Sequence, residues 1–243
     1  ALVGVCGRKL GLKERVLVHQ TSPGLPLSEV GSLARNIVLF SLACEMVGCL
    51  VLTVAWMERL GWQAPFYALF HSVSALCNAG FSLWADSLCA DVSNPFVNAT
   101  VILLITFGGL GYLVSRELYQ AHTKQIHHLS LHSYIVLITS SCLVVGGAVI
   151  FWFFESGNPT TLGGLEFGGQ FWASIFQSVT TRTAGFNTVS IGDLRDETLL
   201  LMIFLMFIGG SPGSTAGGIK TTTFALLLLA AGSQMRDQPE VVV

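Results

Sequence analysis

Apolar runs of two lengths alternate along this chain. Four of them approach or exceed the roughly 20 residues that a helix needs to cross the hydrocarbon core of a membrane. They cover residues 37–56, 96–114, 133–154 and 199–229, and two shorter runs, 66–76 and 171–179, lie between them. A short apolar segment between two spans is typical of a re-entrant or buried helix. The order predicts an all-α polytopic membrane protein in which span, half-span and span occur twice.

Composition excludes several other classes of protein. Hydrophobic residues make up 52% of the chain and charged residues only 11%, whereas a soluble domain carries about a quarter charged residues. The net charge of −2 argues against a nucleic-acid partner. The cysteines form no Cys-x-x-Cys pair, so we expect neither a zinc site nor a disulfide framework. No nucleophile–base pair or metal-ligand cluster is evident, and we expect no enzyme activity and no cofactor.

Basic residues gather on one side of the predicted membrane. They occupy the loops at 8–35 and 116–132 and the tail at Arg236, and such loops are usually cytoplasmic. The opposite side holds eight carboxylates: Glu58, Asp86, Asp91, Glu155, Glu166, Asp193, Asp196 and Glu197. These carboxylates would attract cations to the outer face, but by themselves they are better explained as ordinary solvated loop charge.

The two halves of the chain repeat each other. Phe66-Tyr67-Ala68 matches Phe171-Trp172-Ala173 at an offset of 105 residues, and the same offset aligns Ala79-Gly80-Phe81 with Ala184-Gly185-Phe186. Repeats of this kind pack together and build a shared site where they meet. We therefore divide the chain into 1–34, the end of a first unit with a cytoplasmic loop, and two span–half-span–span units at 35–131 and 132–243.

Both half-spans end in the same Ala-Gly-Phe turn. Non-helical backbone at such depth persists only where it lines water or is buried in protein, and its carbonyl oxygens can replace the hydration shell of a cation. Glycine allows the positive φ that such a turn needs. We predict an ion filter made of Asn78, Ala79, Gly80, Phe81, Thr183, Ala184, Gly185 and Phe186. The alternative is a non-conducting membrane scaffold in which these glycines merely turn the chain.

The last apolar run is interrupted by a glycine-rich segment. Five glycines and a proline within twelve residues cannot maintain a regular helix. The segment predicts a gating loop, or a ligand site, in a discontinuous helix. Its residues are Gly209, Gly210, Ser211, Pro212, Gly213, Ser214, Thr215, Ala216, Gly217, Gly218 and Lys220. Lys220 is either functional within the span or extends its amine to the cytoplasmic edge, and the role of Glu45 within the first long run is equally open.

The same segment nearly matches a phosphate-binding loop. The pattern G-x-x-x-x-G-K-[ST] places lysine directly after the second glycine, but here Ile219 separates Gly218 from Lys220. The flanking sequence is also membrane-like. An ATP-driven membrane enzyme is therefore the weaker alternative.

Three segments resemble the Trk/Ktr/HKT cation-transporter superfamily. Residues 178–188, Ser-Val-Thr-Thr-Arg-Thr-Ala-Gly-Phe-Asn-Thr, look like its third filter region, and residues 207–220 look like the intramembrane loop that follows. His71 to Ala75 and Asn78 to Trp84 resemble the second filter region of the Ktr branch. The Trk branch usually has a second glycine where this chain has Ala79.

The resemblance implies four such units around one pore in a bacterial inner membrane. It implies potassium as the transported ion, often with sodium as an activating ion, and no other metal. It further implies a homodimer among membrane lipids, gated by a cytoplasmic ring of nucleotide-binding regulatory subunits. Because two of four units cannot enclose a pore, we expect this polypeptide alone to conduct nothing.

Overall fold

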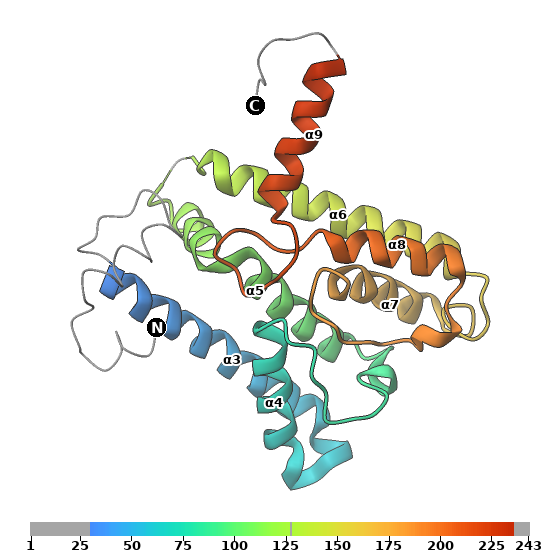
Figure 1. Cartoon of the computed structure of the whole chain (residues 1–243). Helices are drawn as coiled ribbons and strands as arrows, with labels where there is room; N and C mark the ends of the chain where they lie inside the picture. Colours follow the sequence, from blue (N-terminus) through green and yellow to red (C-terminus); the bar gives the residue numbers. More distant parts are fainter. Residues whose placement is uncertain (1–29, 127, 236–243) are drawn as a thin grey trace.

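The structure is a computed structural model that describes residues 30–126 and 128–235. Most of the predicted segment 1–34, with its basic loop, and the basic residue Arg236 lie outside the described residues. Within them the secondary structure is helical, apart from one parallel bridge between Ile208 and Ile219. The helices and their connections are shown in Figure 1. The expected all-α membrane architecture is confirmed.

The first complete unit consists of α3 (Val30–Leu60), the short 3-10 turn η1 (Gly61–Gln63), α4 (Ala64–Leu76), the turn η2 (Cys89–Asp91) and α5 (Pro95–His122). Helix α4 contains the predicted half-span, and Pro65 lies in its first turn, where a missing N–H costs little. Asn94 caps α5, because its Oδ1 accepts from the amides of Phe96 and Val97.

The second unit consists of α6 (Leu131–Glu155), α7 (Phe167–Thr180), the turn η3 (Ile191–Asp193), α8 (Asp196–Phe207) and α9 (Thr221–Met235). Helix α7 contains the other half-span. The predicted run 199–229 is divided between α8 and α9, which are separated by the glycine-rich loop. The expected interruption is therefore present in the fold.

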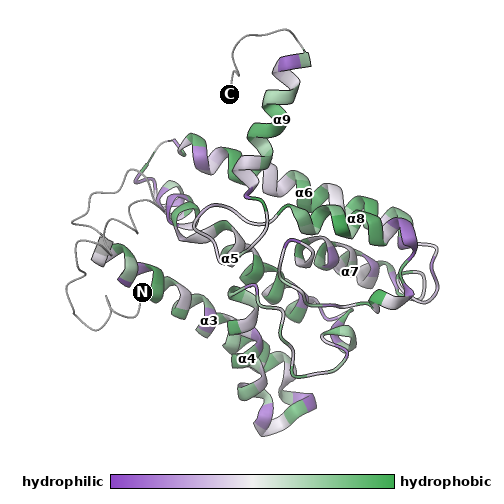
Figure 2. Ribbon diagram, viewed as in Figure 1, coloured by the Kyte–Doolittle hydropathy of each residue, from purple (hydrophilic) through white to green (hydrophobic). Residues whose placement is uncertain are grey.

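Three helical segments are long and apolar enough to cross a membrane. They are Gly31–Leu76, which includes both α3 and α4, then Pro95–His122 and Leu131–Glu155. Helix α9 is apolar but shorter. Large apolar side chains stay exposed along these helices, such as Val54 and Phe153. The ribbon of these helices is mostly in the hydrophobic colour in Figure 2. A surface of this kind is that of a multi-pass membrane protein.

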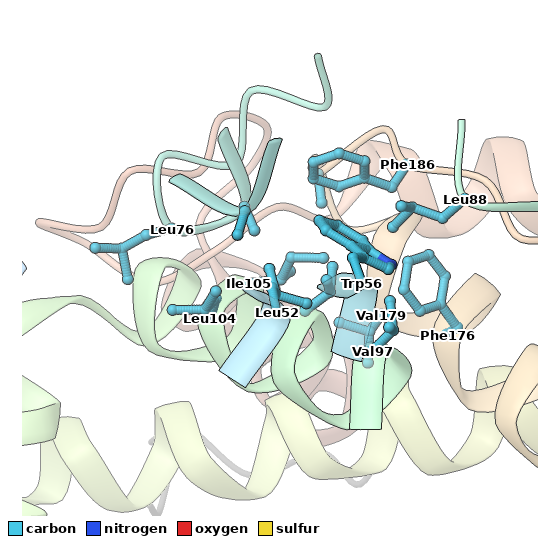
Figure 3. Packing of buried hydrophobic residues seen from close by; sticks show 14 of the residues in the cluster. Leu52, Trp56, Leu76, Leu88, Val97, Leu104, Ile105, Phe176, Val179 and Phe186 are labelled. Atoms are coloured by element: carbon cyan, nitrogen blue, oxygen red, sulfur yellow. The ribbon is translucent and has the colours of Figure 1, made fainter. Parts of the chain in front are cut away.

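One apolar core joins the two units. Helix α4 packs on α3 and α7 packs on α6, and the two half-span helices meet side chains from both units in the centre. Trp56 of α3, Val97 of α5 and Phe176 of α7 are all at most 1% exposed and lie together with Phe186 (Figure 3). The core therefore fixes the two half-span helices, and the turns that follow them, relative to one another.

Helix α5 contains a kink that the sequence reasoning did not predict. Gly111 has φ 77° and ψ 165°, which is not helical. An added Cβ there would lie 2.9 Å from the carbonyl oxygen of Gly213 in the glycine-rich loop. The kink thus lies where that loop approaches the backbone of α5, within the glycine-rich stretch Gly108-Gly109-Leu110-Gly111.

Candidate functional site: two re-entrant turns and an intramembrane loop

The two re-entrant turns share one hydrogen bond that closes each of them. The hydroxyl of Ser74, near the end of α4, donates to the carbonyl oxygen of Phe81 at 2.9 Å. The hydroxyl of Thr180, the last residue of α7, donates to the carbonyl oxygen of Phe186 at 2.8 Å. In each turn, therefore, a hydroxyl of the half-span helix donates a hydrogen bond to the carbonyl oxygen of the phenylalanine that follows the glycine.

Both turns also share an unusual backbone conformation. The predicted filter glycines Gly80 and Gly185 have φ +69° and φ +92°, and Asn78 and Thr183, two residues before them, have φ +51° and φ +83°. Positive φ is uncommon outside glycine, so its recurrence at matching positions marks one backbone path used twice. The turns also touch: a Cβ added to Gly80 would overlap the carbonyl oxygen of Ala184 and lie 2.8 Å from the Cα of Gly185.

Each half-span helix is attached to the preceding span in the same way. The hydroxyl of Ser72 donates to the carbonyl oxygen of Glu45 at 2.7 Å, and that of Ser178 to the carbonyl oxygen of Val144 at 2.8 Å. A glycine of the span lies against each serine, Gly48 in the first unit and Gly147 in the second. Small residues let membrane helices approach closely and form such hydrogen bonds.

The glycine-rich loop is closed at its base by backbone pairing. The amide of Ile219 donates to the carbonyl oxygen of Phe207 at 3.1 Å, and the amide of Gly209 donates to that of Ile219 at 2.9 Å. The loop leaves α8 and returns to α9 through this narrow base. It is an ordered hairpin-like excursion rather than an open break in a helix.

The loop lies on the backbone of α5. The amides of Ser211 and Thr215 donate to the carbonyl oxygens of Gly109 and Gly108, at 2.9 and 3.1 Å, and the hydroxyl of Ser211 donates to that of Leu110. In Figure 1 the loop between α8 and α9 passes across α5. These contacts satisfy polar backbone groups of an irregular segment, as burial within a membrane protein requires.

Both re-entrant turns hold the loop. Thr215 donates its hydroxyl to the carbonyl oxygen of Leu76 at 2.9 Å and accepts from the side-chain amide of Asn78 at 2.8 Å. From the other turn, Arg182 donates to the carbonyl oxygen of Gly209 at 3.3 Å and to the hydroxyl of Ser140 on α6 at 3.1 Å. The structure therefore brings the predicted filter residues and the predicted gating loop into direct contact.

Two residues with open roles receive partial answers. The amine of Lys220 donates to the carbonyl oxygen of Ala216 at 2.9 Å, so it is bonded within its own loop. The backbone of Glu45 accepts the hydroxyl of Ser72, as described above. The near match to a phosphate-binding loop falls in the same segment, and it follows helix α8 rather than a strand.

A cavity of about 290 Å³ lies between α5, α6 and α7, next to the turns and the loop. Its lining is mostly apolar but includes Asn78, Arg182 and Gly210. Among the described residues, Asn78 Oδ1 and Arg182 Nε are buried without a hydrogen-bond partner. The described residues contain no group of three or more His, Cys, Asp or Glu side chains that could hold a metal ion.

Comparison with known proteins establishes the family. The family model described as "TrkH: Cation transport protein" matches residues 13–243. This chain belongs to the TrkH cation transport family. The resemblance noted from the filter and loop segments is thereby confirmed.

Curated TrkH-family relatives align along the whole chain. The Ktr system potassium uptake protein B of Vibrio alginolyticus is 40% identical over 243 residues, all of this chain and 53% of that protein. The protein of the same description from Bacillus subtilis is 37% identical over all of this chain and 54% of its own length. The chain thus spans about half the length of these relatives, which are named as uptake proteins rather than enzymes.

A solved structure of the TrkH family has the same fold. The crystal structure of the potassium transporter TrkH from Vibrio parahaemolyticus superposes with a TM-score of 0.68, at 19% sequence identity. The match covers 91% of this chain and 45% of that one. At this identity the likeness concerns the fold.

Sequence reasoning missed the hydroxyls that hold the turns. Ser74, Thr180 and Arg182 are not among the predicted filter residues, although Arg182 lies within the segment 178–188 that carries the family resemblance. One signal was available. Ser74 and Thr180 are 106 positions apart, whereas the two Ala-Gly-Phe turns that they close are 105 positions apart. The same slip aligns Ser72 with Ser178.

Proposed function

We propose that this chain forms part of a potassium uptake pore. Gly80 and Gly185 lie in its selectivity filter, and the loop at 209–220 is its gate. One observation carries the proposal: two re-entrant turns with the same hydroxyl-to-carbonyl closure and the same positive-φ glycine meet beside an irregular loop. A scaffold would need neither the duplicated backbone path nor the contacts between turn and loop.

The chemistry of the turns suits an alkali-metal cation. A filter of this kind replaces the hydration shell of the ion with carbonyl oxygens, and the glycines allow the backbone to present them. The relatives support potassium, since those from Vibrio alginolyticus and Bacillus subtilis are named as potassium uptake proteins. A relative from Enterococcus hirae, 34% identical, is named as a potassium/sodium uptake protein. We propose sodium as an activating ion on that basis.

The partners of the pore follow from the family resemblance. We propose a homodimer in the membrane, and regulation by a cytoplasmic ring of nucleotide-binding subunits. Displacement of the loop from the turns would be the step that such a ring controls.

The experiment is rubidium uptake by the full-length protein in cells that lack their own potassium uptake. Gly185→Asp is compared with wild type and with Gly168→Asp. Gly168 lies in the first turn of α7, is exposed, and has no atom within 4 Å of an added Cβ. A carboxylate is favourable at a helix N-terminus, so the control carries the same substitution in the same unit without touching the turn.

We expect uptake in wild type and Gly168→Asp, and at least a tenfold loss in Gly185→Asp at equal expression in the membrane. Equal uptake in Gly185→Asp and Gly168→Asp would remove Gly185 from the conduction path. No uptake in any of them, with all three present in the membrane, would return the scaffold as the better explanation.

A further inference from the structure

Four segments that are distant in the sequence converge on one point beside the first turn. They are the end of α4 at Leu76, the turn at Asn78, helix α5 at Gly108 and the loop at Thr215. A Cβ added to Gly108 would overlap the Leu76 carbonyl oxygen and lie 2.7 Å from Asn78 Nδ2 and 2.9 Å from Thr215 Oγ1. The convergence leaves no room for a side chain or for an intervening water.

The Thr215 hydroxyl is the centre of this arrangement. It donates to the Leu76 carbonyl oxygen at 2.9 Å and accepts from Asn78 Nδ2 at 2.8 Å. One hydroxyl is therefore bonded both to the end of α4 and to the first turn. Asn78 is itself held at φ +51°, two residues before the filter glycine Gly80. The conformation of the turn and the position of the loop are therefore linked through one side chain from each.

The second turn contacts the loop differently. Thr183, which aligns with Asn78, has a buried hydroxyl without a hydrogen-bond partner among the described residues. The contact comes instead from Arg182, which reaches Gly209 at the base of the loop. Only the first turn thus holds the loop through the side chain of a residue within the positive-φ segment itself.

We propose that Asn78 and Thr215 are positioning residues that couple ion selection in the first turn to the position of the loop. The proposal rests on the function proposed above. When the loop leaves its place, the Leu76 carbonyl and the Asn78 amide lose their common partner in a dry environment, where unpaired polar groups are costly. The turn then relaxes from its positive-φ conformation. By linkage, an ion that favours the ordered turn also favours the docked loop.

The test compares ion ratios in the full-length protein. Uptake of rubidium and of sodium is measured in cells that lack their own potassium uptake, for wild type, Thr215→Val, Thr215→Ala and Thr215→Ser. Valine keeps the shape of threonine but removes the hydroxyl, alanine removes it without adding bulk, and serine keeps it. Ser211→Ala is the matched control, because the Ser211 hydroxyl also holds the loop on α5 but touches neither turn.

We expect the rubidium-to-sodium uptake ratio to fall about 25-fold in Thr215→Val and Thr215→Ala, because both hydrogen bonds of the hydroxyl are lost and each shifts a two-state equilibrium about fivefold. Thr215→Ser retains the wild-type ratio. Ser211→Ala changes the uptake rate without changing the ratio. When Asn78→Ala is combined with Thr215→Val or with Thr215→Ala, the ratio falls no further than in the more affected single variant. The reason is that both changes remove the hydrogen bond between Asn78 and Thr215.

A wild-type ratio in both Thr215→Val and Thr215→Ala, with transport intact, would overturn the coupling and leave the proposed pore standing. An equal fall of the ratio in Ser211→Ala would also overturn it, because the effect would then belong to loop docking in general. Absence of uptake in the wild-type protein would instead count against the proposed function itself.

Discussion

The two units of this chain build similar turns but hold the ends of their long helices in different ways. In the first unit, Asp91 accepts from the indole of Trp56 and from Arg59, both at 3.1 Å. In the second unit, Glu155 at the end of α6 is fully buried and accepts from neutral donors alone among the described residues. These are the side chains of Asn158, Thr161 and Thr198 and the backbone amide of Arg195.

The difference separates what the site requires from what merely supports it. If the turns form the proposed filter, their shared positive-φ positions have a reason, because main-chain oxygens that coordinate an ion have little freedom of position. The anchors only have to hold the end of a long helix, α3 or α6, against the segment that follows the turn, η2 or the start of α8. The first unit meets that need with the ion pair between Asp91 and the half-exposed Arg59. The second unit meets it with the buried carboxylate of Glu155 and its four hydrogen bonds, so the two units differ there.

The largest expected effect concerns these anchors. Glu155→Ala removes a fully buried carboxylate and its four hydrogen bonds, and we expect it to lower stability by about 3 kcal/mol. Asp91→Ala should cost less, about 2 kcal/mol: its pair with Arg59, which is 39% exposed, is weakened by solvent, and the main loss is the hydrogen bond from the buried Trp56 indole. Thermal unfolding of the full-length protein in detergent measures both. If Asp91→Ala costs as much as Glu155→Ala, the ion pair is no weaker an anchor than the buried carboxylate.

The filter glycines should differ next. Both have positive φ, which costs an alanine about 1 kcal/mol. A Cβ at Gly80 also overlaps the Ala184 carbonyl, whereas at Gly185 the nearest atom is the Cα of Gly80 at 3.4 Å. Overpacking adds about 2 kcal/mol, so we expect Gly80→Ala to abolish rubidium uptake and Gly185→Ala to reduce it. The reverse order would show that the second turn carries more of the site.

The smallest effect is expected where the units are alike. Ser74→Ala and Thr180→Val each remove the hydroxyl that closes one turn, and each should cost about 1 kcal/mol. Rubidium-to-sodium uptake ratios should fall by a similar factor in both, with Thr100→Val as the control. That threonine donates to the helix carbonyl of Phe96 at an exposed site on α5. Unequal losses would mean that one turn governs selection.

Much of the fold could be predicted from the lengths of the apolar runs. The predicted half-spans lie in α4 and α7, and the glycine-rich segment separates α8 from α9. Both features are predictable because the length of an apolar helix and the helix-breaking effect of glycine and proline are local properties. The duplicated Ala-Gly-Phe likewise indicated two equivalent turns, and the structure gives them matching backbone angles.

The tertiary structure alone decided which groups meet. Asn78 and Thr215 are 137 residues apart and share a hydrogen bond, and the loop lies against α5 at the Gly111 kink. Nothing local in those segments specifies the partner. A polar group in a membrane must be paired, but the packing of whole helices determines which donor comes within reach of which acceptor. The sequence by itself determined the elements and their breaks, whereas the contacts between the turns and the loop arose from their packing.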